Sequence, residues 1–250
     1  NQSSVIGLLR VLSQWQADRS YPFTFVTEAS INLAAEKEIL DLMVECAFTR
    51  VFIGIETPDA NTLSSAGKRQ NVEHDILESV KSIQSSGIEV IAGFILGFDT
   101  DTGDIFDRQI NFIQEAAIPV AMVGLMLALP GTRLYRRLER DGRILYETCG
   151  NNTNMLDLNF IPVMDKDKII EGYKKVLGTI YSPVRYFERS LALISRIPDS
   201  VYKKRGLRVQ DIIAFVKSFL LMAFSPYCFR YIHFLVKTLM INPRNFALAV

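Results

Sequence analysis

The feature that most constrains the fold is a repeated alternation of short apolar runs with helical patterns. The apolar runs cover residues 22–27, 50–55, 88–96 and 120–128. The last two are almost continuously apolar, which is typical of strands covered on both faces. Between the runs, apolar residues recur at helical spacing, as in Val72, Ile76, Val80 and Ile83. This alternation predicts parallel βαβ units with right-handed crossovers.

The pattern changes after about residue 145. An irregular stretch at 146–162 precedes four expected helices, at roughly 165–180, 183–195, 208–223 and 226–240. Prolines punctuate them, as is usual where helices begin or end. We therefore expect an α/β domain at 1–145 and a helical domain at 146–250. Four strands leave an open sheet and a barrel as alternatives.

Composition narrows the class of protein. The chain has 28 Lys+Arg against 27 Asp+Glu, a formal net charge of +1. This balance predicts no general attraction to nucleic acid or to an anionic membrane. Cys46, Cys149 and Cys228 are too widely spaced for a metal motif or a disulfide framework, so buried thiols in a reducing cytoplasm are expected. Because the chain begins at Asn1 and stops inside an apolar run at Val250, we expect a fragment.

The helix expected at 208–223 is strongly apolar. It contains Ile212, Ile213 and Val216, but Lys217 interrupts it and Pro226 ends it. A membrane-spanning helix needs about 20 apolar residues, so this one is too short to predict a span. Burial against the barrel or a partner is the favoured interpretation, and peripheral membrane contact is the alternative.

Polar residues and glycines follow the apolar runs. Ligands of parallel α/β folds bind at the carboxyl ends of the strands, so these positions are the candidate site. Glu28 follows the first run, and Glu56 and Thr57 follow the second. Ionised carboxylates at such places need a cation, a hydroxyl or a ligand. The third run ends in Gly93, Gly97 and Asp99, and the fourth leads through Ala128 to Pro130.

A structural interpretation competes for part of this set. Turn and capping roles explain Asp99, Thr100, Asp101 and Thr102 about as well as ligand binding does. Glycine lets a backbone approach a ligand closely, but it serves turns equally well. Two carboxylates and two glycine-bearing turns at one edge suit a ligand rich in hydroxyls and amines, such as a nucleoside joined to an amino acid.

Three segments carry a resemblance to a known family. Residues 52–57, Phe-Ile-Gly-Ile-Glu-Thr, resemble the fourth-strand "GIE" element of radical S-adenosylmethionine (SAM) enzymes. Residues 93–99 resemble their fifth-strand Gly-x-Ile-x-Gly element, and residues 129–135 resemble their sixth-strand Pro-Gly-Thr element. The segment 27–33 and the helical tail resemble the cobalamin-binding subgroup that includes the hopanoid methylases and carries a C-terminal domain of unknown function.

The resemblance implies a partial (β/α) TIM-like barrel with about four strands visible here, and a helical C-terminal extension. It implies SAM cleavage by a [4Fe–4S] cluster, and cobalamin-dependent methyl transfer to an unactivated carbon, with cyclisation and rearrangement as other reactions. Glu56 would lie near the ribose, Gly93 to Gly97 against the adenosyl group, and Ala128–Pro130 beside the adenine. The family often has Glu where Asp99 and Thr100 stand.

The chain departs from the family because it lacks the cluster-binding Cys-x-x-x-Cys-x-x-Cys motif and a cobalamin domain. We therefore expect an N-terminally truncated part of the enzyme, inactive alone, with its cluster and cobalamin ligands outside this chain and no metal ligands within it. The expected partners are a small-molecule or lipid-like substrate and the missing N-terminal part. Two rival hypotheses are a non-catalytic barrel scaffold and an aldolase-like barrel, but an aldolase should have a strand-end lysine and none is present.

Overall fold

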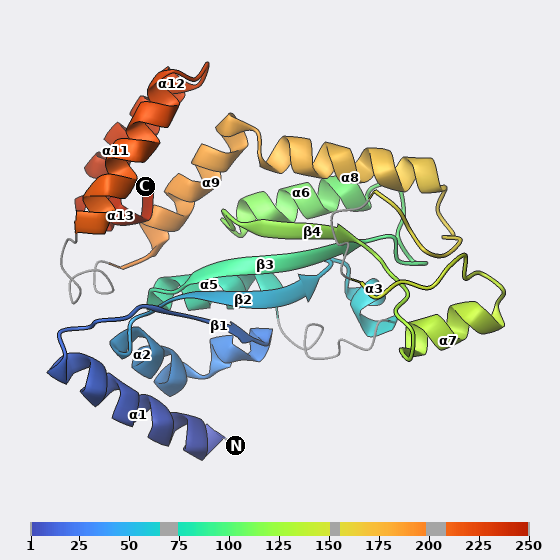
Figure 1. Ribbon diagram of the computed structural model, residues 1–250, viewed down its shortest axis with the longest axis horizontal. Helices are drawn as coiled ribbons and strands as arrows, with labels where there is room; N and C mark the ends of the chain where they lie inside the picture. Colours follow the sequence, from blue (N-terminus) through green and yellow to red (C-terminus); the bar gives the residue numbers. More distant parts are fainter. Residues whose placement is uncertain (1, 66–74, 151–155, 199–208, 250) are drawn as a thin grey trace.

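A single parallel sheet forms the centre of the protein. The computed structural model describes residues 2–65, 75–150, 156–198 and 209–249. Within them the sheet consists of β1 (Phe25–Ala29), β2 (Phe48–Glu56), β3 (Glu89–Leu96) and β4 (Ala121–Leu125). All three pairings are parallel and the strand order is β1-β2-β3-β4 (Figure 1). The predicted α/β class is confirmed, and the open sheet is consistent with a partial (β/α) barrel.

Helices connect the strands and extend the chain beyond them. Those around the sheet are α1 (Gln2–Asp18), the 3-10 helix Ile31–Ala35, α2 (Lys37–Glu45), α3 (Ala60–Ser65), α5 (Ile76–Ser86) and α6 (Ile105–Glu115). Those beyond it are α7 (Arg133–Arg140), α8 (Lys166–Ile180), α9 (Pro183–Arg196), α11 (Val209–Ala223), α12 (Cys228–Ile241), the 3-10 helix Pro243–Asn245 and α13 (Phe246–Ala249). The helices expected from the periodicity are present, while positions 72–74 and 208 lie outside the described residues. The boundary predicted between 1–145 and 146–250 stays a prediction.

Local sequence signals explain several helix ends. The Asp75 side chain accepts a hydrogen bond from the Glu78 amide and so caps α5 at its start. Gly87 ends the same helix with φ of 109°, a left-handed conformation that glycine adopts without steric cost. Pro183 opens α9 at a position where its missing N–H costs nothing. Asp104 occupies the N-cap of α6, but its side chain makes no capping bond and instead accepts a bond from Thr102.

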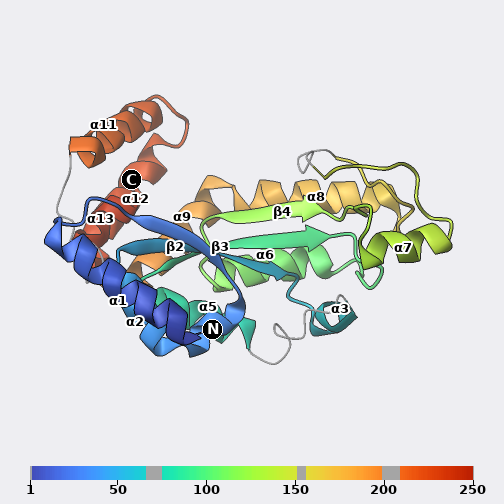
Figure 2. The same ribbon diagram turned by 60° about the horizontal axis from the view of Figure 1, so that its bottom comes forward.

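One face of the sheet carries the main core. Alternate strand residues such as Val51, Ile53, Val90 and Leu96 are completely buried. They pack against α2, α5, α6 and α8, and α5 lies behind the strands in Figure 1 and below them in Figure 2. Burial of this many branched side chains is the main stabilising contribution to the fold.

The opposite face is less covered, which corrects the expectation of strands buried on both sides. The parallel register places Val26 and Glu28 of β1 on the same face as Phe52 of β2. Val26 is 59% exposed, and Met122 on β4 is 61% exposed. Among the described residues, this side of the sheet has no helical layer comparable to that on the core face (Figure 2). The almost continuous apolar sequence of β3 and β4 therefore does not mean that both faces of the sheet are covered by other elements of this chain.

A buried arginine joins the C-terminal helices to the sheet. Arg189 of α9 is fully buried, and its guanidinium donates to the carbonyl oxygens of Ile118 (2.8 Å) and Pro119 (3.1 Å), just before β4. It also donates to the carbonyl of Ile180 at the end of α8. Tyr181 lies 5.5 Å from its central carbon. Because the buried charge is surrounded by oxygen acceptors and a ring face, α8 and α9 are fixed against the amino-terminal end of β4.

Helices α11 and α12 form a hairpin beyond α9. Phe234 of α12 stacks on Phe187 of α9 with ring centroids 4.8 Å apart, and Tyr231 shares a 2.6 Å hydrogen bond with Ser218 of α11. These contacts belong to a second, smaller hydrophobic cluster, separate from the core under the sheet. Of the helices that the structure describes, none combines the length and the hydropathy needed to cross a bilayer.

Candidate functional site

The carboxyl end of β2 has an unusual backbone conformation. Glu56 is the final residue of β2, with φ of 69°, and the Thr57 amide donates to the Ile55 carbonyl at 2.9 Å. The hydrogen bond between residues two apart closes a tight turn around Glu56. A non-glycine residue with positive φ costs about 1–3 kcal/mol. Ser20, Tyr21, Ala47 and Ala117 share this conformation, but Glu56 has it at the carboxyl end of a strand. The structure thus places the predicted Glu56 at the sheet edge in a strained turn.

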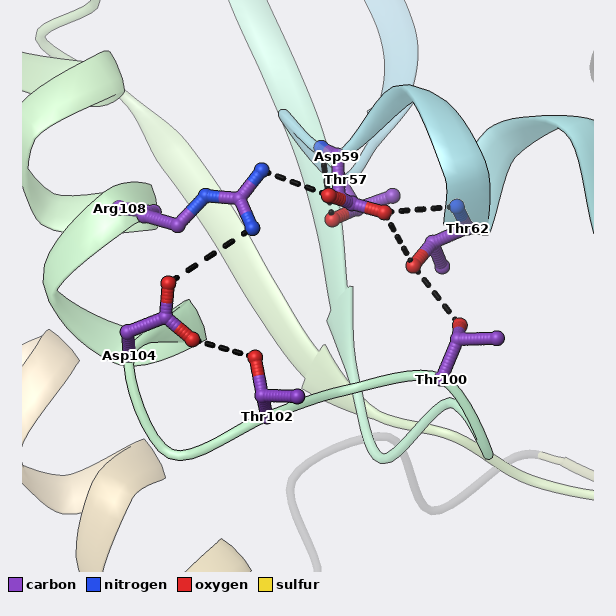
Figure 3. A network of polar contacts seen from close by, with 7 residues as sticks. All are labelled: Thr57, Asp59, Thr62, Thr100, Thr102, Asp104 and Arg108. Atoms are coloured by element: carbon purple, nitrogen blue, oxygen red, sulfur yellow. Dashed lines mark hydrogen bonds and ion pairs between the residues drawn. The ribbon is translucent and has the colours of Figure 1, made fainter.

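A polar network continues from this turn (Figure 3). Thr57 is fully buried, and its hydroxyl accepts a bond from the Asp59 amide at 3.3 Å. Asp59 accepts bonds from the amide and hydroxyl of Thr62, at 2.7 and 2.8 Å, and from Arg108 at 2.6 Å. The Thr62 and Thr100 hydroxyls are 2.8 Å apart, which links the loops after β2 and β3. Burial alone would raise the pKa of Asp59, but these hydrogen bonds outweigh it and lower the pKa.

Asp101 is the second carboxylate in the loop after β3. One of its oxygens accepts bonds from the Gly97 amide (2.8 Å) and the Phe98 amide (3.0 Å). The other oxygen is buried, with no hydrogen-bond partner among the described residues. Burial raises the pKa of Asp101 to about 6, against the two amide bonds, and the nearby charge of Asp59 adds to the rise. Sequence analysis left a turn or capping role and ligand binding as equally good explanations of Asp101, because aspartate is common in turns and caps.

Asp99, in contrast, is fully engaged by cations. It accepts bonds from Arg143 at 2.7 and 3.1 Å and from Arg137 of α7 at 2.8 Å. The Arg143 hydrogen bonds, helped by the charge of Arg137, hold the pKa of Asp99 below its usual value. Among the residues predicted to bind a cofactor, Asp99 therefore acts in this structure as an anchor for α7 and the segment after it.

The structure explains the glycines at positions 93 and 97 in two different ways. Gly97 has φ of 102°, which only glycine adopts readily, and this conformation turns its amide toward Asp101. A Cβ at Gly93 would lie 2.9 Å from the Phe52 ring, so the space beside Gly93 is filled from β2. At Gly124 on β4, a Cβ would meet nothing within 4 Å. Sequence analysis did not single out Gly124, which looks like an ordinary residue within an apolar run.

The remaining predicted residues lie around the same end of the sheet. Glu28 lies within β1 and not after it, because the strand runs two residues further than the apolar pattern suggested. Its side chain is exposed and stands outside the network of Figure 3. Ala128 lies three residues beyond β4, where its amide and carbonyl both bond the buried Asn159 side chain at 2.8 Å. Pro130 is exposed before α7.

The described residues do not offer a metal centre. They contain no group of three or more His, Cys, Asp or Glu side chains placed to hold an ion. Cys46, Cys149 and Cys228 are free, and the buried Cys46 thiol donates to the Leu9 carbonyl at 3.1 Å. A [4Fe–4S] cluster needs thiolate ligands close together, so this part of the chain does not fit one. The buried position of Cys46 agrees with the structural role predicted for it. Cys149 is exposed and Cys228 is partly exposed, so the expectation of a buried thiol is wrong for Cys149.

The opposite end of the sheet has a cavity of about 500 Å³. It lies between α9, α11 and α12 and the amino-terminal ends of β3 and β4. The Arg50–Glu89 ion pair, with 2.7 Å between its atoms, lies at the sheet side, and aromatic residues such as Phe187 and Tyr231 line the rest. Because catalytic groups of parallel α/β folds gather at the carboxyl end, we place the candidate active site at Glu56 and not in this cavity.

Comparison with known proteins gives relatives with methyltransferase names. The chain is 40% identical over 190 residues to an uncharacterized methyltransferase of Synechocystis sp., which covers 76% of this chain and 35% of that protein. It is 35% identical over 189 residues to the hopanoid C-2 methylase of Rhodopseudomonas palustris, with the same coverages. The bacteriochlorophyllide d C-12(1)-methyltransferase of Chlorobaculum tepidum is 24% identical over 110 residues, 44% of this chain and 24% of that protein. The chain thus spans about a third of the length of the first two relatives.

The C-terminal part matches a family described as a domain of unknown function, DUF4070, over residues 132–250. The fold defines a parallel α/β protein, and the polar residues at the carboxyl ends of its strands form the candidate ligand site. The C-terminal domain and the methyltransferase relatives together fit the cobalamin-binding radical SAM-like family that carries this domain, as the sequence motifs predicted. The names of these relatives, two methyltransferases and a methylase, support a family of enzymes.

Proposed function

We propose that this chain is the C-terminal part of a radical SAM methyltransferase that transfers a methyl group to an unactivated carbon. The complete enzyme would use a [4Fe–4S] cluster and cobalamin, both held by residues outside this chain. The observation that carries the proposal is the 35% identity over 189 residues to a protein named hopanoid C-2 methylase. The position of Glu56 at the carboxyl end of β2 supports it, because ligands of parallel α/β folds bind at that edge.

SAM would supply the methyl group and, with the cluster, the radical. In this proposal Glu56 binds the ribose hydroxyls, since a carboxylate is a strong acceptor for hydroxyl donors. Thr57 and the Asp59–Arg108 ion pair hold the turn around Glu56 in place. The Gly93–Gly97 strand end lies along the adenosyl group, and Ala128 to Pro130 flank the adenine. Because Asp99 is held by two arginines, its part is to position the loop and not to contact SAM.

The site also has room for such a ligand on the less covered face of the sheet. A Cβ at Gly124 would meet no atom within 4 Å, so a ligand could approach the β4 backbone there. We propose that the substrate is a small or lipid-like molecule, and that the N-terminal part of the same protein completes the site. An oxygen-sensitive cluster and free thiols suit a reducing cytoplasm.

The test uses the complete protein, expressed without oxygen and reconstituted with iron, sulfide and cobalamin. With dithionite added as the electron donor that reduces the cluster, we expect 5′-deoxyadenosine and S-adenosylhomocysteine to form from SAM. Glu56→Gln should weaken SAM binding by about ten- to hundredfold, because a charge-assisted hydrogen bond contributes about 1.5–3 kcal/mol. Glu115→Gln, at an exposed position on α6, is the matched control and should bind SAM normally.

Two outcomes would contradict parts of the proposal. If the complete protein holds no cluster and releases no 5′-deoxyadenosine, the chain belongs to a non-catalytic barrel protein. If SAM is cleaved but Glu56→Gln binds it as tightly as the unaltered protein, the reaction class stands and the ribose contact is wrong.

A further inference from the structure

The α11–α12 hairpin exposes an apolar face that the rest of the described chain does not cover. The residues at its turn are the most exposed, with Phe224 at 90% and Phe229 at 87%. Along the helices the exposed apolar residues are Val209, Ile212, Ile213, Val216, Phe219, Leu220, Leu221, Ile232, Val236, Leu239, Met240 and Ile241. Contiguous exposed apolar surface of this kind marks a site of interaction, because single exposed residues are normal but large patches are not.

The apolar residues form a stripe beside the side that packs on α9, and its members Val236, Met240 and Ile241 line a groove against that helix. On α12 the buried residues Tyr231, Phe234 and Leu235 contribute to the smaller hydrophobic cluster. Phe229, Ile232 and Val236 follow each other at steps of three and four residues and therefore share another face. The helix is apolar on both sides, although it is too short to cross a membrane. The hairpin projects beyond the sheet (Figure 1).

The charges beside this stripe are basic. Lys217 of α11 and Arg230 and Lys237 of α12 are exposed, and His233 lies among them. Asp211 is the one acidic residue from Val209 to Val250, against four Lys and Arg in that stretch. The hairpin is therefore locally cationic, although the whole chain is close to neutral at +1.

We propose that the α11–α12 hairpin docks on the surface of an anionic lipid bilayer, with Phe224 and Phe229 entering the headgroup region. Apolar helix faces flanked by Lys and Arg bind in the plane of the interface, where the long basic side chains reach anionic headgroups. Aromatic side chains are favoured at that depth. A second copy of the chain is a poorer occupant, because pairing two such faces would bring cationic side chains together, and the core of protein interfaces is depleted in lysine.

The experiment measures co-sedimentation of the 250-residue chain with vesicles of phosphatidylcholine alone and of phosphatidylcholine mixed with phosphatidylglycerol. We expect binding to the mixed vesicles that weakens as salt is added, because salt screens the lysine and arginine charges. Phe224→Ser with Phe229→Ser should lower the affinity at least about tenfold, since two phenyl groups that would be buried among the lipids are removed. Lys217→Glu with Lys237→Glu should lower binding to the anionic vesicles by a similar factor and leave phosphatidylcholine binding unchanged.

The matched control is Leu8→Ser with Val11→Ser on α1, two apolar residues that are 68% and 70% exposed. This variant loses the same kind of surface elsewhere and should bind vesicles like the unaltered chain. The proposal is overturned if the phenylalanine variant binds vesicles as well as the control does, or if vesicle binding does not depend on lipid charge and salt concentration. It is also overturned if sedimentation velocity shows a dimer that the phenylalanine substitutions dissociate, because the face is then a subunit interface. The same variants in the complete protein must lower vesicle binding; no effect there would mean that another segment covers the hairpin.

Discussion

The two ends of the sheet treat buried polar groups differently. At the amino-terminal end, Arg189 donates to three backbone carbonyls, and Gln84 donates to the carbonyls of Ala116 and Ala117 at 3.0 Å. At the carboxyl end, the Asp101 carboxyl group retains a buried oxygen without a described partner. Oxygens without described partners at the amino-terminal end, on Gln16 and Asn245, belong to neutral amides and cost less to bury. Positive φ does not distinguish the ends, because Ala47 and Ala117 before β2 and β4 have it as well as Glu56. The difference is therefore one of charge: the carboxyl end buries an ionisable group with incomplete hydrogen bonding, and the amino-terminal end satisfies its buried arginine.

The largest effect is expected at the amino-terminal end. Arg189→Met should lower the free energy of unfolding by about 3–5 kcal/mol, because three carbonyls lose their donor in a buried site. Urea denaturation checks this value. Arg185→Met on the same helix is the control, since the Arg185 side chain is 52% exposed, and it should cost less than about 0.5 kcal/mol. Equal losses in both variants would show that Arg189 does not join α9 to the sheet.

The second prediction concerns how Asp101, at the carboxyl end of the sheet, makes the stability of the protein depend on pH. The pKa of Asp101 rises from its ordinary value of 3.8 to about 6, so the folded protein binds this proton more tightly than the unfolded chain. Stability then falls as the pH rises from about 4 to about 6, and the loss amounts to roughly 3 kcal/mol above that range. Asp101→Asn keeps an acceptor for the two amides but does not ionise. The free energy of unfolding of the variant, measured relative to that of the unaltered protein, should therefore be higher at pH 8 than at pH 4 by roughly 3 kcal/mol.

The measurement is urea denaturation of both proteins at several pH values. If the stability difference between Asp101→Asn and the unaltered protein does not depend on pH, Asp101 titrates normally and the carboxyl end carries no electrostatic cost.

A smaller cost is expected from the turn that follows β3. Gly97→Ala should destabilise the protein by about 1–3 kcal/mol, because alanine disfavours φ of 102° and its Cβ would lie 3.2 Å from Leu158. Gly103→Ala in the same loop meets nothing within 4 Å and should not destabilise it. Thermal denaturation of the two variants distinguishes them. If both are tolerated, the left-handed conformation of Gly97 is not required.

The smallest effect has the opposite sign. Glu56→Gly should stabilise the protein by up to about 1 kcal/mol, because glycine adopts φ of 69° without steric cost, although it loses more conformational entropy on folding. Glu28→Gly, in the extended backbone of β1, should instead cost about 0.5–1 kcal/mol. In the complete protein we expect the stabilised Glu56→Gly variant to lose SAM binding. Chemical denaturation measures the stability of the variant, and a binding assay measures its affinity for SAM. A variant that is more stable and still binds SAM would show that Glu56 is not needed for binding.

The strands and helices were predictable because their signals are local. The periodicity located α5 and the C-cap at Gly87 is an ordinary glycine signal. The uncovered sheet face was not predictable, because an apolar run has the same sequence whether its second face meets a helix of this chain or something else. The roles of Asp99 and Asp101 also required the structure. Arg143 lies 44 residues from Asp99 in sequence, and only the folded chain brings the two together.

The order of the strands has a consequence for how the protein forms during synthesis. Each strand pairs with the strand made just before it, and the order β1-β2-β3-β4 contains no insertion from a later segment. A growing chain can therefore add one βα unit at a time as it leaves the ribosome, without waiting for distant partners. The bonds from Arg189 to Ile118 and Pro119 form only after α9 has been made, about 70 residues later. Until then water must donate hydrogen bonds to these two carbonyl oxygens. The docking of α9 is therefore a late step that stabilises a sheet whose strands are already paired.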